Sequence, residues 1–335
     1  MIDWTPNSIA LQLGPFSLFW YGIAYASGLA LAYWIMTRQA RALGENAALI
    51  GNGLIIVAVA ALIGGRLYHV IDQWQLYKDD LIKIVLPPYS GLGIFGGFVT
   101  GTIAVLALVR YHKVSAWRWA DIVAPGIFLM QAAGRWGNFF NQELYGPPTN
   151  LPWGIAIDCA HRVVEYPCDL FPLATTHFQP LFLYESISAM IGAATLVWLS
   201  RRPRPWLRVG DMGAIMLIWI GGVRFMIEFL RIGNWRIGDI PTAQYFGAAF
   251  VLIGIAILVI RRRQHAPQSV TEEMVLARAA AEDAKDDDPF ADDEFDDDVD
   301  DGGDEGEASD DVAPPAGAGA RAKADQKDDA GPSTA

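Results

Sequence analysis

The chain has 335 residues, of which 53% are hydrophobic, and its formal charge at pH 7 is −12. Residues 266–335 carry 23 Asp and Glu against 5 Lys and Arg, whereas residues 1–265 carry 14 acidic and 20 basic side chains. A basic, apolar body followed by an acidic extension excludes an ordinary soluble globular protein, and the net charge does not describe a single surface.

The body contains seven apolar runs of about 18–25 residues, each long enough to cross the hydrocarbon layer as a helix. A single run of this kind is commonly a buried core helix, but a soluble core has no room for seven. The alternating pattern of a membrane barrel is absent. We therefore expect an all-α, polytopic membrane protein with seven transmembrane helices, over residues 16–36, 47–70, 89–109, 119–140, 180–199, 213–230 and 243–260.

Basic residues at the ends of the runs predict the orientation. The segments that follow the first, third, fifth and seventh runs carry 12 Lys and Arg, whereas the other, longer connections carry 5. Because basic residues concentrate in short cytoplasmic segments, the N-terminus is expected outside and the C-terminus in the cytoplasm. The first run is expected to be a retained anchor, since Asp3 precedes it and no Lys or Arg does.

Two parts of the chain differ from the spans. Residues 141–179 form the longest connection in the body, contain five prolines and are expected to form a small external domain or lid. Cys159 and Cys168 lie there, and a disulfide and two free thiols remain equally open readings. Residues 1–265 are expected to form the membrane domain, and residues 266–335 a disordered, acidic cytoplasmic tail.

Polar side chains inside the runs are the strongest functional signal, because charge in a bilayer is costly. Arg135 and Asn138 are three residues apart, Arg224 and Glu228 are four apart, and Arg231 follows on the same helix face as Arg224. A guanidinium group holds a phosphate through two parallel hydrogen bonds. The spacing therefore favours a site for an anionic lipid headgroup near the outer leaflet.

A purely structural interpretation competes with this one. An ion pair between Arg224 and Glu228 is equally well explained as a contact that only holds helices together. Arg66 and Arg231 lie near helix ends, where a long side chain is expected to reach the membrane interface. The arginines outnumber the acids expected nearby, which favours an anion. No residues are spaced as metal ligands, no cofactor is indicated, and nothing supports nucleic-acid binding.

One stretch of the sequence resembles a known family. Residues 134–146 match every fixed position of Gly-Arg-x-Gly-Asn-Phe-x-Asn-x-Glu-x-x-Gly, the signature of the bacterial prolipoprotein diacylglyceryl transferases. Further segments agree in order, and the resemblance covers about residues 14–262 but not the acidic tail. These further segments are residues 20–22, 121–125, 179–185 and 224–231.

The resemblance implies a seven-span enzyme of the bacterial cell membrane with its N-terminus outside. Its substrates would be phosphatidylglycerol, a membrane lipid, and preproteins that carry a lipobox cysteine. The diacylglyceryl group passes to the cysteine thiol, a thioether forms, and glycerol phosphate leaves. With this reaction, the expected catalytic residues are Arg135, Arg224, Glu143 and Tyr21, and the expected substrate-binding residues are Arg135, Asn138, Asn141, Gly146 and Glu228.

The third run departs from the family pattern. Many members carry His-Gly-Gly there, whereas this chain has Phe95 before its two glycines. Since Phe accepts no proton, either the base lies elsewhere or the reaction requires no residue that acts as a base at this position. Glu143 is the favoured acceptor and His69 a weaker one, although Glu143 pairs equally well as a cap at the end of its helix. An anion or lipid transporter and a non-catalytic assembly factor remain rival readings.

Overall fold

The structure is a computed structural model that describes residues 1–14, 16–84, 91 and 93–286. Eight α-helices account for most of the described chain, with two short β-hairpins and three single 3₁₀ turns. In chain order the elements are β1 (Ile9–Leu13), β2 (Phe16–Phe19), α1 (Trp20–Ala42), α2 (Ala48–Asp72), η1 (Trp74–Leu76), η2 (Leu81–Ile84), α3 (Ile94–Tyr111), α4 (Ala116–Phe140), η3 (Cys159–His161), α5 (Leu181–Ser200), α6 (Asp211–Ile227), β3 (Arg236–Ile237), β4 (Ile240–Pro241), α7 (Thr242–Arg263) and α8 (Glu272–Asp286).

Each of the seven predicted runs overlaps one of the helices α1 to α7, and residues 89, 90 and 92 of the third run lie outside the described residues. Among the described residues, α2, α5 and α7 are long and apolar enough to cross a membrane, and α3 contains a shorter apolar helical stretch. The structure therefore confirms a predominantly helical protein with apolar spans. The crossing of the bilayer seven times stays a prediction, because α1 and α4 carry more polar and aromatic side chains and α6 has 17 residues.

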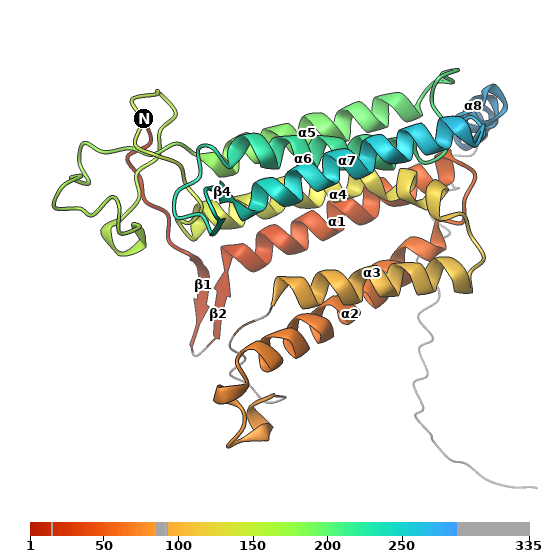
Figure 1. The fold of residues 1–335 in the computed structure, drawn as a ribbon. Coiled ribbons are helices and arrows are strands. Elements are labelled where there is room, and N and C mark those ends of the chain that lie inside the picture. The colour runs from red at the N-terminus through yellow and green to blue at the C-terminus, as the bar shows by residue number, and fades with distance from the viewer. Residues whose placement is uncertain (15, 85–90, 92, 287–335) are drawn as a thin grey trace, which may run out of the picture. The chain divides into compact units, whose positions relative to one another are not determined.

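The start of the first predicted span was wrong. Residues 16–19 form strand β2, which pairs antiparallel with β1, and α1 begins at Trp20. Gly14 has φ +58°, a conformation that suits a tight turn between the two strands. The apolar run thus begins in a hairpin that projects beyond the start of α1 (Figure 1).

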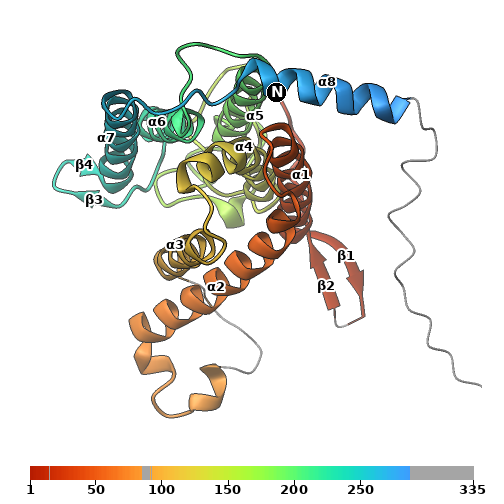
Figure 2. The ribbon, with the colours of Figure 1, turned by 90° about the vertical axis from the view of Figure 1, so that its right-hand side faces the viewer.

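Helix α4 is the centre of the packing. It lies against α1, α5 and α6, while α6 packs closely on α7, and α2 pairs mainly with α3 (Figures 1 and 2). Small residues allow these approaches: a Cβ on Gly192 of α5 would come 2.7 Å from the ring of Phe128 in α4, which is 1% exposed. Such close contact fixes the relative positions of α4 and α5.

A buried polar network connects α4, α6 and the chain after α7 at the end of the bundle where α4 and α6 begin. Asp121 of α4 is fully buried and accepts hydrogen bonds from the backbone N–H of Gly210 (2.8 Å) and Gly213 (3.1 Å) and from the hydroxyl of Ser269 (3.1 Å). These bonds satisfy N–H groups before and within the first turn of α6. The chain that follows α7 is therefore fastened to the same point as α4 and α6.

The predicted boundary of the disordered tail was also wrong. Disorder was expected from residue 266, but Val270 is fully buried, Val275 packs against the core, and residues 272–286 form α8. The acidic composition of the whole tail concealed this short apolar segment, which has a hydrophobic surface to pack on. Residues 287–335 lie outside the described residues.

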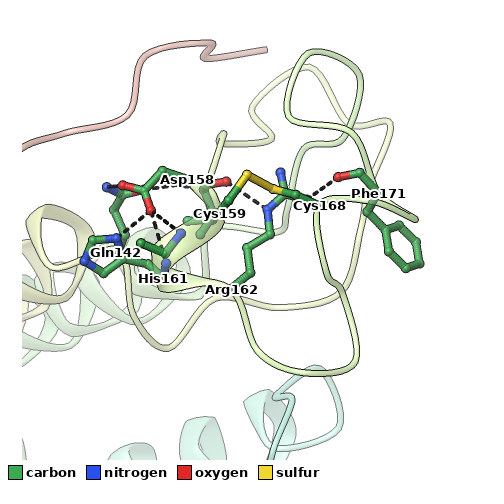
Figure 3. The surroundings of a disulfide bond; sticks show 9 residues. Gln142, Asp158, Cys159, His161, Arg162, Cys168 and Phe171 are labelled. Carbon is green, nitrogen blue, oxygen red and sulfur yellow. Dashed lines mark hydrogen bonds and ion pairs between the residues drawn. A yellow bond between two sulfur atoms is a disulfide. The ribbon is translucent and has the colours of Figure 1, made fainter.

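Residues 141–179 contain no long helix and are joined by a disulfide. Cys159 and Cys168 are bonded, with Cα atoms 5.6 Å apart, so the open question on these cysteines is resolved in favour of the bridge. Figure 3 shows Arg162 beside the bridge, where its guanidinium donates to the carbonyls of Ile157 and Phe171. Burial lowers the pKa of this guanidinium below its usual value. The bridge and Arg162 thus hold the same loop.

The N-terminal residues also contact residues 141–179. Ile2 bridges Ile155 of the segment through backbone hydrogen bonds, and the carboxylate of Asp3 lies 2.7 Å from Nε2 of the buried His177. The first residues of the chain therefore add an edge to the segment.

Removing the disulfide should loosen residues 141–179 locally. A small closed loop is stabilised by roughly 2–3 kcal/mol, which corresponds to about 30-fold or more in local opening. In a C159S/C168S double variant, we expect proteolytic cleavage within this segment to become about 30-fold faster, while the helices stay intact. Reductant should accelerate cleavage of the natural chain but not of the variant, and equal cleavage rates for both chains would contradict this role.

Candidate active site

A buried carboxylate connects two arginines from different helices. Glu185 of α5 is 5% exposed; its Oε2 lies 2.5 Å from Nε of Arg135 in α4, and its Oε1 lies 3.6 Å from Nη1 of Arg224 in α6. The Arg135 and Arg224 side chains are only 23% and 26% exposed. Three helices thus bring two guanidinium groups to one carboxylate.

The predicted pair on α6 is present. Nη2 of Arg224 lies 3.0 Å from Oε2 of Glu228, which is buried at the end of the helix. We call Arg135, Glu185, Arg224 and Glu228 the ion-pair cluster. In a low-dielectric setting these pairs are strong in Coulombic terms, but each charge also costs solvation, so their arrangement is a weak argument for stability and a better one for function.

Arg231 adds a third cation to this region. It lies just beyond α6, and burial together with the positive charge of Arg224 lowers the pKa of its guanidinium. With Glu143 included, three arginines and three carboxylates of the described part of the chain gather here, so the expected excess of arginine is not found among them. The reason is that Glu185 and Glu143 approach from elements other than the one that carries Arg224.

A chain of hydrogen bonds leads from the cluster to Glu143. Nη1 of Arg135 donates to Oδ1 of Asn138 (3.3 Å), and Nδ2 of Asn138 donates to Oε1 of Glu143 (2.8 Å). Asn138 is buried, whereas Glu143 is exposed. The amide therefore links a buried guanidinium to a carboxylate that solvent and substrates can reach.

The backbone around Glu143 is held in an unusual conformation. Gln142 and Leu144, on either side, have φ values of 52° and 57°, which non-glycine residues rarely adopt. The Gln142 amide donates to the carbonyl of Pro6 (3.0 Å) and to Asp158 (2.7 Å), and accepts from the Asp158 N–H. Burial would raise the pKa of Asp158, but hydrogen bonds from His161 and Gln142 outweigh it, so the pKa lies below its usual value.

Tyr21, from the start of α1, belongs to the same region. Its ring packs over Gly137, where an added Cβ would come 2.6 Å from Cδ2, and its hydroxyl lies 3.3 Å from that of Tyr25. Tyr21 is also within electrostatic range of Glu143 and Arg135. The structure thus brings together Arg135, Arg224, Glu143 and Tyr21, with Asn138 and Glu228.

Two predicted substrate-binding residues, Asn141 and Gly146, lie at points where the backbone is constrained. Asn141 is the C-cap of α4, and its N–H donates to the carbonyl of Gly137 (3.0 Å). Gly146 is buried, and an added Cβ would come 3.1 Å from the carbonyl oxygen of Leu230. Among the described residues, neither forms a hydrogen bond or an ion pair with the ion-pair cluster, so their roles in binding stay predictions.

Phe95 and His69 lie in other surroundings. Phe95 contacts the rings of Tyr68 and Phe246, so an apolar contact occupies the position of the family's histidine. Gly91 packs closely against the ring of His69. Arg66 donates to the carbonyls of residues 83, 84 and 91, which supports its structural reading.

Glu185 lies inside the fifth predicted run, near its start, but it was not among the predicted site residues. Its signal was present, since an acid in an apolar run requires a cationic partner. The role of Gln142 had no comparable signal, because its partners Pro6 and Asp158 are distant in sequence and become neighbours only in the fold.

Comparison with known proteins gives the family of the chain. Residues 8–260 match the family model described as prolipoprotein diacylglyceryl transferase. Proteins named phosphatidylglycerol–prolipoprotein diacylglyceryl transferase are similar over most of their length. One from Enterococcus faecalis is 36% identical over 258 residues, 77% of this chain and 91% of the relative, and one from Synechocystis sp. is 36% identical over 263 residues, 76% and 89%. One from Streptococcus suis is 32% identical over 258 residues, 77% and 93%.

Proposed function

The chain belongs to the prolipoprotein diacylglyceryl transferase family, and on that premise we propose that it transfers the diacylglyceryl group of phosphatidylglycerol to the cysteine thiol of prolipoproteins. The observation that carries the proposal is the meeting of Arg135 and Arg224 at the buried carboxylate of Glu185. Guanidinium groups stay charged when desolvated and fit a phosphate. Such a pair, mostly withdrawn from solvent, suits a phospholipid headgroup.

The reaction replaces a carbon–oxygen bond with a carbon–sulfur bond. The thiolate attacks the diacylglyceryl carbon, the bond from that carbon to the phosphate oxygen breaks, and glycerol phosphate leaves with the electron pair. Negative charge gathers on the phosphate as the bond breaks, and Arg135 and Arg224 stabilise it. Asn138 orients Arg135, and Glu228 orients Arg224.

The thiol must lose its proton before it attacks, since the thiolate is the nucleophile. Glu143 is exposed, lies at the end of the hydrogen-bond chain from Arg135, and accepts this proton in our scheme. Tyr21, which packs beside α4 at Gly137, and Asn141 contact the headgroup. Gly146 contributes by allowing the close approach of the chain around it.

The membrane arrangement follows the charge pattern. We place α1 to α7 across the bacterial cell membrane, with the N-terminus and residues 141–179 outside and the C-terminus in the cytoplasm. The exposed apolar side chains of α2, α3 and α7 then contact lipid. The protein substrates are secreted preproteins that carry a lipobox cysteine, and they approach from the outer face.

Reconstitution tests the proposal directly. The full chain in vesicles that contain phosphatidylglycerol should increase the mass of a lipobox peptide by one diacylglyceryl group. A peptide with serine in place of cysteine should be unchanged, because its hydroxyl is far less acidic. Movement of lipid without a mass gain would indicate a transporter and contradict the proposal.

A further inference from the structure

Glu185 is the point through which the two arginines are connected. Its carboxylate is a rigid, planar group, and its two oxygens contact guanidinium groups from two different helices. The separation and relative orientation of Arg135 and Arg224 therefore depend on this side chain. Glu228, in contrast, contacts Arg224 from the same helix and sets no distance between helices.

The contacts of the two arginines leave donors for an anion. A guanidinium group has five N–H donors in a planar fork. Arg135 donates a hydrogen bond through Nη1 to Asn138, whereas its contact with Glu185 and the contacts of Arg224 with Glu185 and Glu228 are ion pairs. These ion pairs hold each guanidinium group beside a carboxylate, and further N–H groups of both forks remain for a phosphate.

A carboxylate beside an anion site has an electrostatic cost. Glu185 offsets part of the positive charge that attracts the lipid phosphate, so it weakens binding of the ground state. Its useful effect must then lie in geometry, because correctly aimed donors act most strongly on the charge that develops in the transition state.

We propose that Glu185 is a positioning residue that aligns Arg135 and Arg224 so that their remaining N–H groups converge on one phosphate. This rests on the proposed function. Glu185 acts through the arginines and contacts neither the lipid nor the thiol.

The test is the kinetics of E185Q. The amide keeps the shape of the side chain, but its NH₂ group faces a guanidinium donor and the forks lose their alignment. We expect kcat to fall about 100-fold, while KM for phosphatidylglycerol stays unchanged or decreases because a negative charge has been removed. Equilibrium binding of phosphatidylglycerol should show as many sites per protein as in the natural chain.

E185D provides a second measurement. It keeps the charge but shortens the side chain by one methylene, so kcat should fall about tenfold and exceed that of E185Q. If E185Q does not fold, E185D carries the test alone. A kcat within threefold of the natural chain in the variant measured would overturn the proposal, as would a KM that rises severalfold.

D211N is the matched control for the loss of a buried ion pair. Asp211 is fully buried at the other end of α6 and lies 2.8 Å from Nη1 of Arg262. Its loss should lower thermal stability, yet kcat per folded molecule should stay unchanged. If E185Q loses lipid-binding sites and stability in the same proportion as D211N, Glu185 is merely structural. If the natural chain does not modify the peptide, the proposed function fails instead.

Discussion

Replacing Arg135 with lysine should reduce diacylglyceryl transfer about 1,000-fold while the protein still folds and inserts. Nε of Arg135 contacts Glu185 at 2.5 Å, and Nη1 contacts Asn138 at 3.3 Å. A lysine ammonium places all three donors on one atom and cannot make both contacts while also binding a phosphate. The loss of one such donor in an oxyanion site typically costs about 100- to 1,000-fold in rate. Peptide mass spectrometry in phosphatidylglycerol vesicles measures it.

The matched control is R38K, the same arginine-to-lysine change outside the candidate site. Arg38 lies in the last part of α1, where its guanidinium sits 4.6 Å from the ring centre of Trp34. R38K should transfer at a rate within about twofold of the natural chain, because it contacts no proposed substrate group. Transfer by R135K at a similar rate would remove the phosphate-binding role of Arg135.

The helices of this protein were predictable for a simple physical reason. A segment of about 20 apolar residues has no stable alternative to a helix in a bilayer, so seven runs predicted seven helices. The start of the first helix was predicted wrongly, because residues 16–19 are as apolar as a membrane span. In the structure they form a strand that pairs with β1, with Gly14 in the turn. Hydropathy reports where side chains prefer to be and does not distinguish a short strand from a helical turn.

The candidate site was predictable only within single helices. Helical periodicity predicted that Arg224 would meet Glu228, and the structure has that contact. The link from Arg135 through Glu185 to Arg224 needs three helices in fixed positions, which depend on contacts such as that of Gly192 with Phe128. No spacing in the sequence encodes such a distance.

In the proposed scheme Glu143 is the proton acceptor, since the position of the family's histidine holds Phe95. Phe95 offers no proton acceptor and is packed against Tyr68 and Phe246. Glu143 instead stands between two residues in left-handed conformations, a strained turn that the buried hydrogen bonds of Gln142 hold in place. Strain of this kind costs about 1–3 kcal/mol per residue and persists where the surroundings determine it. The turn therefore fixes the backbone from which Glu143 projects, and the hydrogen bond from Asn138 orients its carboxylate.

Replacing Glu143 with glutamine should lower kcat about 100- to 1,000-fold at neutral pH, the range expected for loss of a general base. The variant's rate should then rise about tenfold per pH unit until the peptide thiol ionises, near its usual pKa of about 8.5. The natural chain should show a flatter profile, because Glu143 removes the proton within the site. E165Q, which changes another exposed glutamate of residues 141–179, should keep the natural profile. A low rate of E143Q with the flat pH profile of the natural chain would contradict this role. Glu143 would then act by orienting Asn138, because only the loss of a base makes deprotonation of the thiol by solvent rate-limiting.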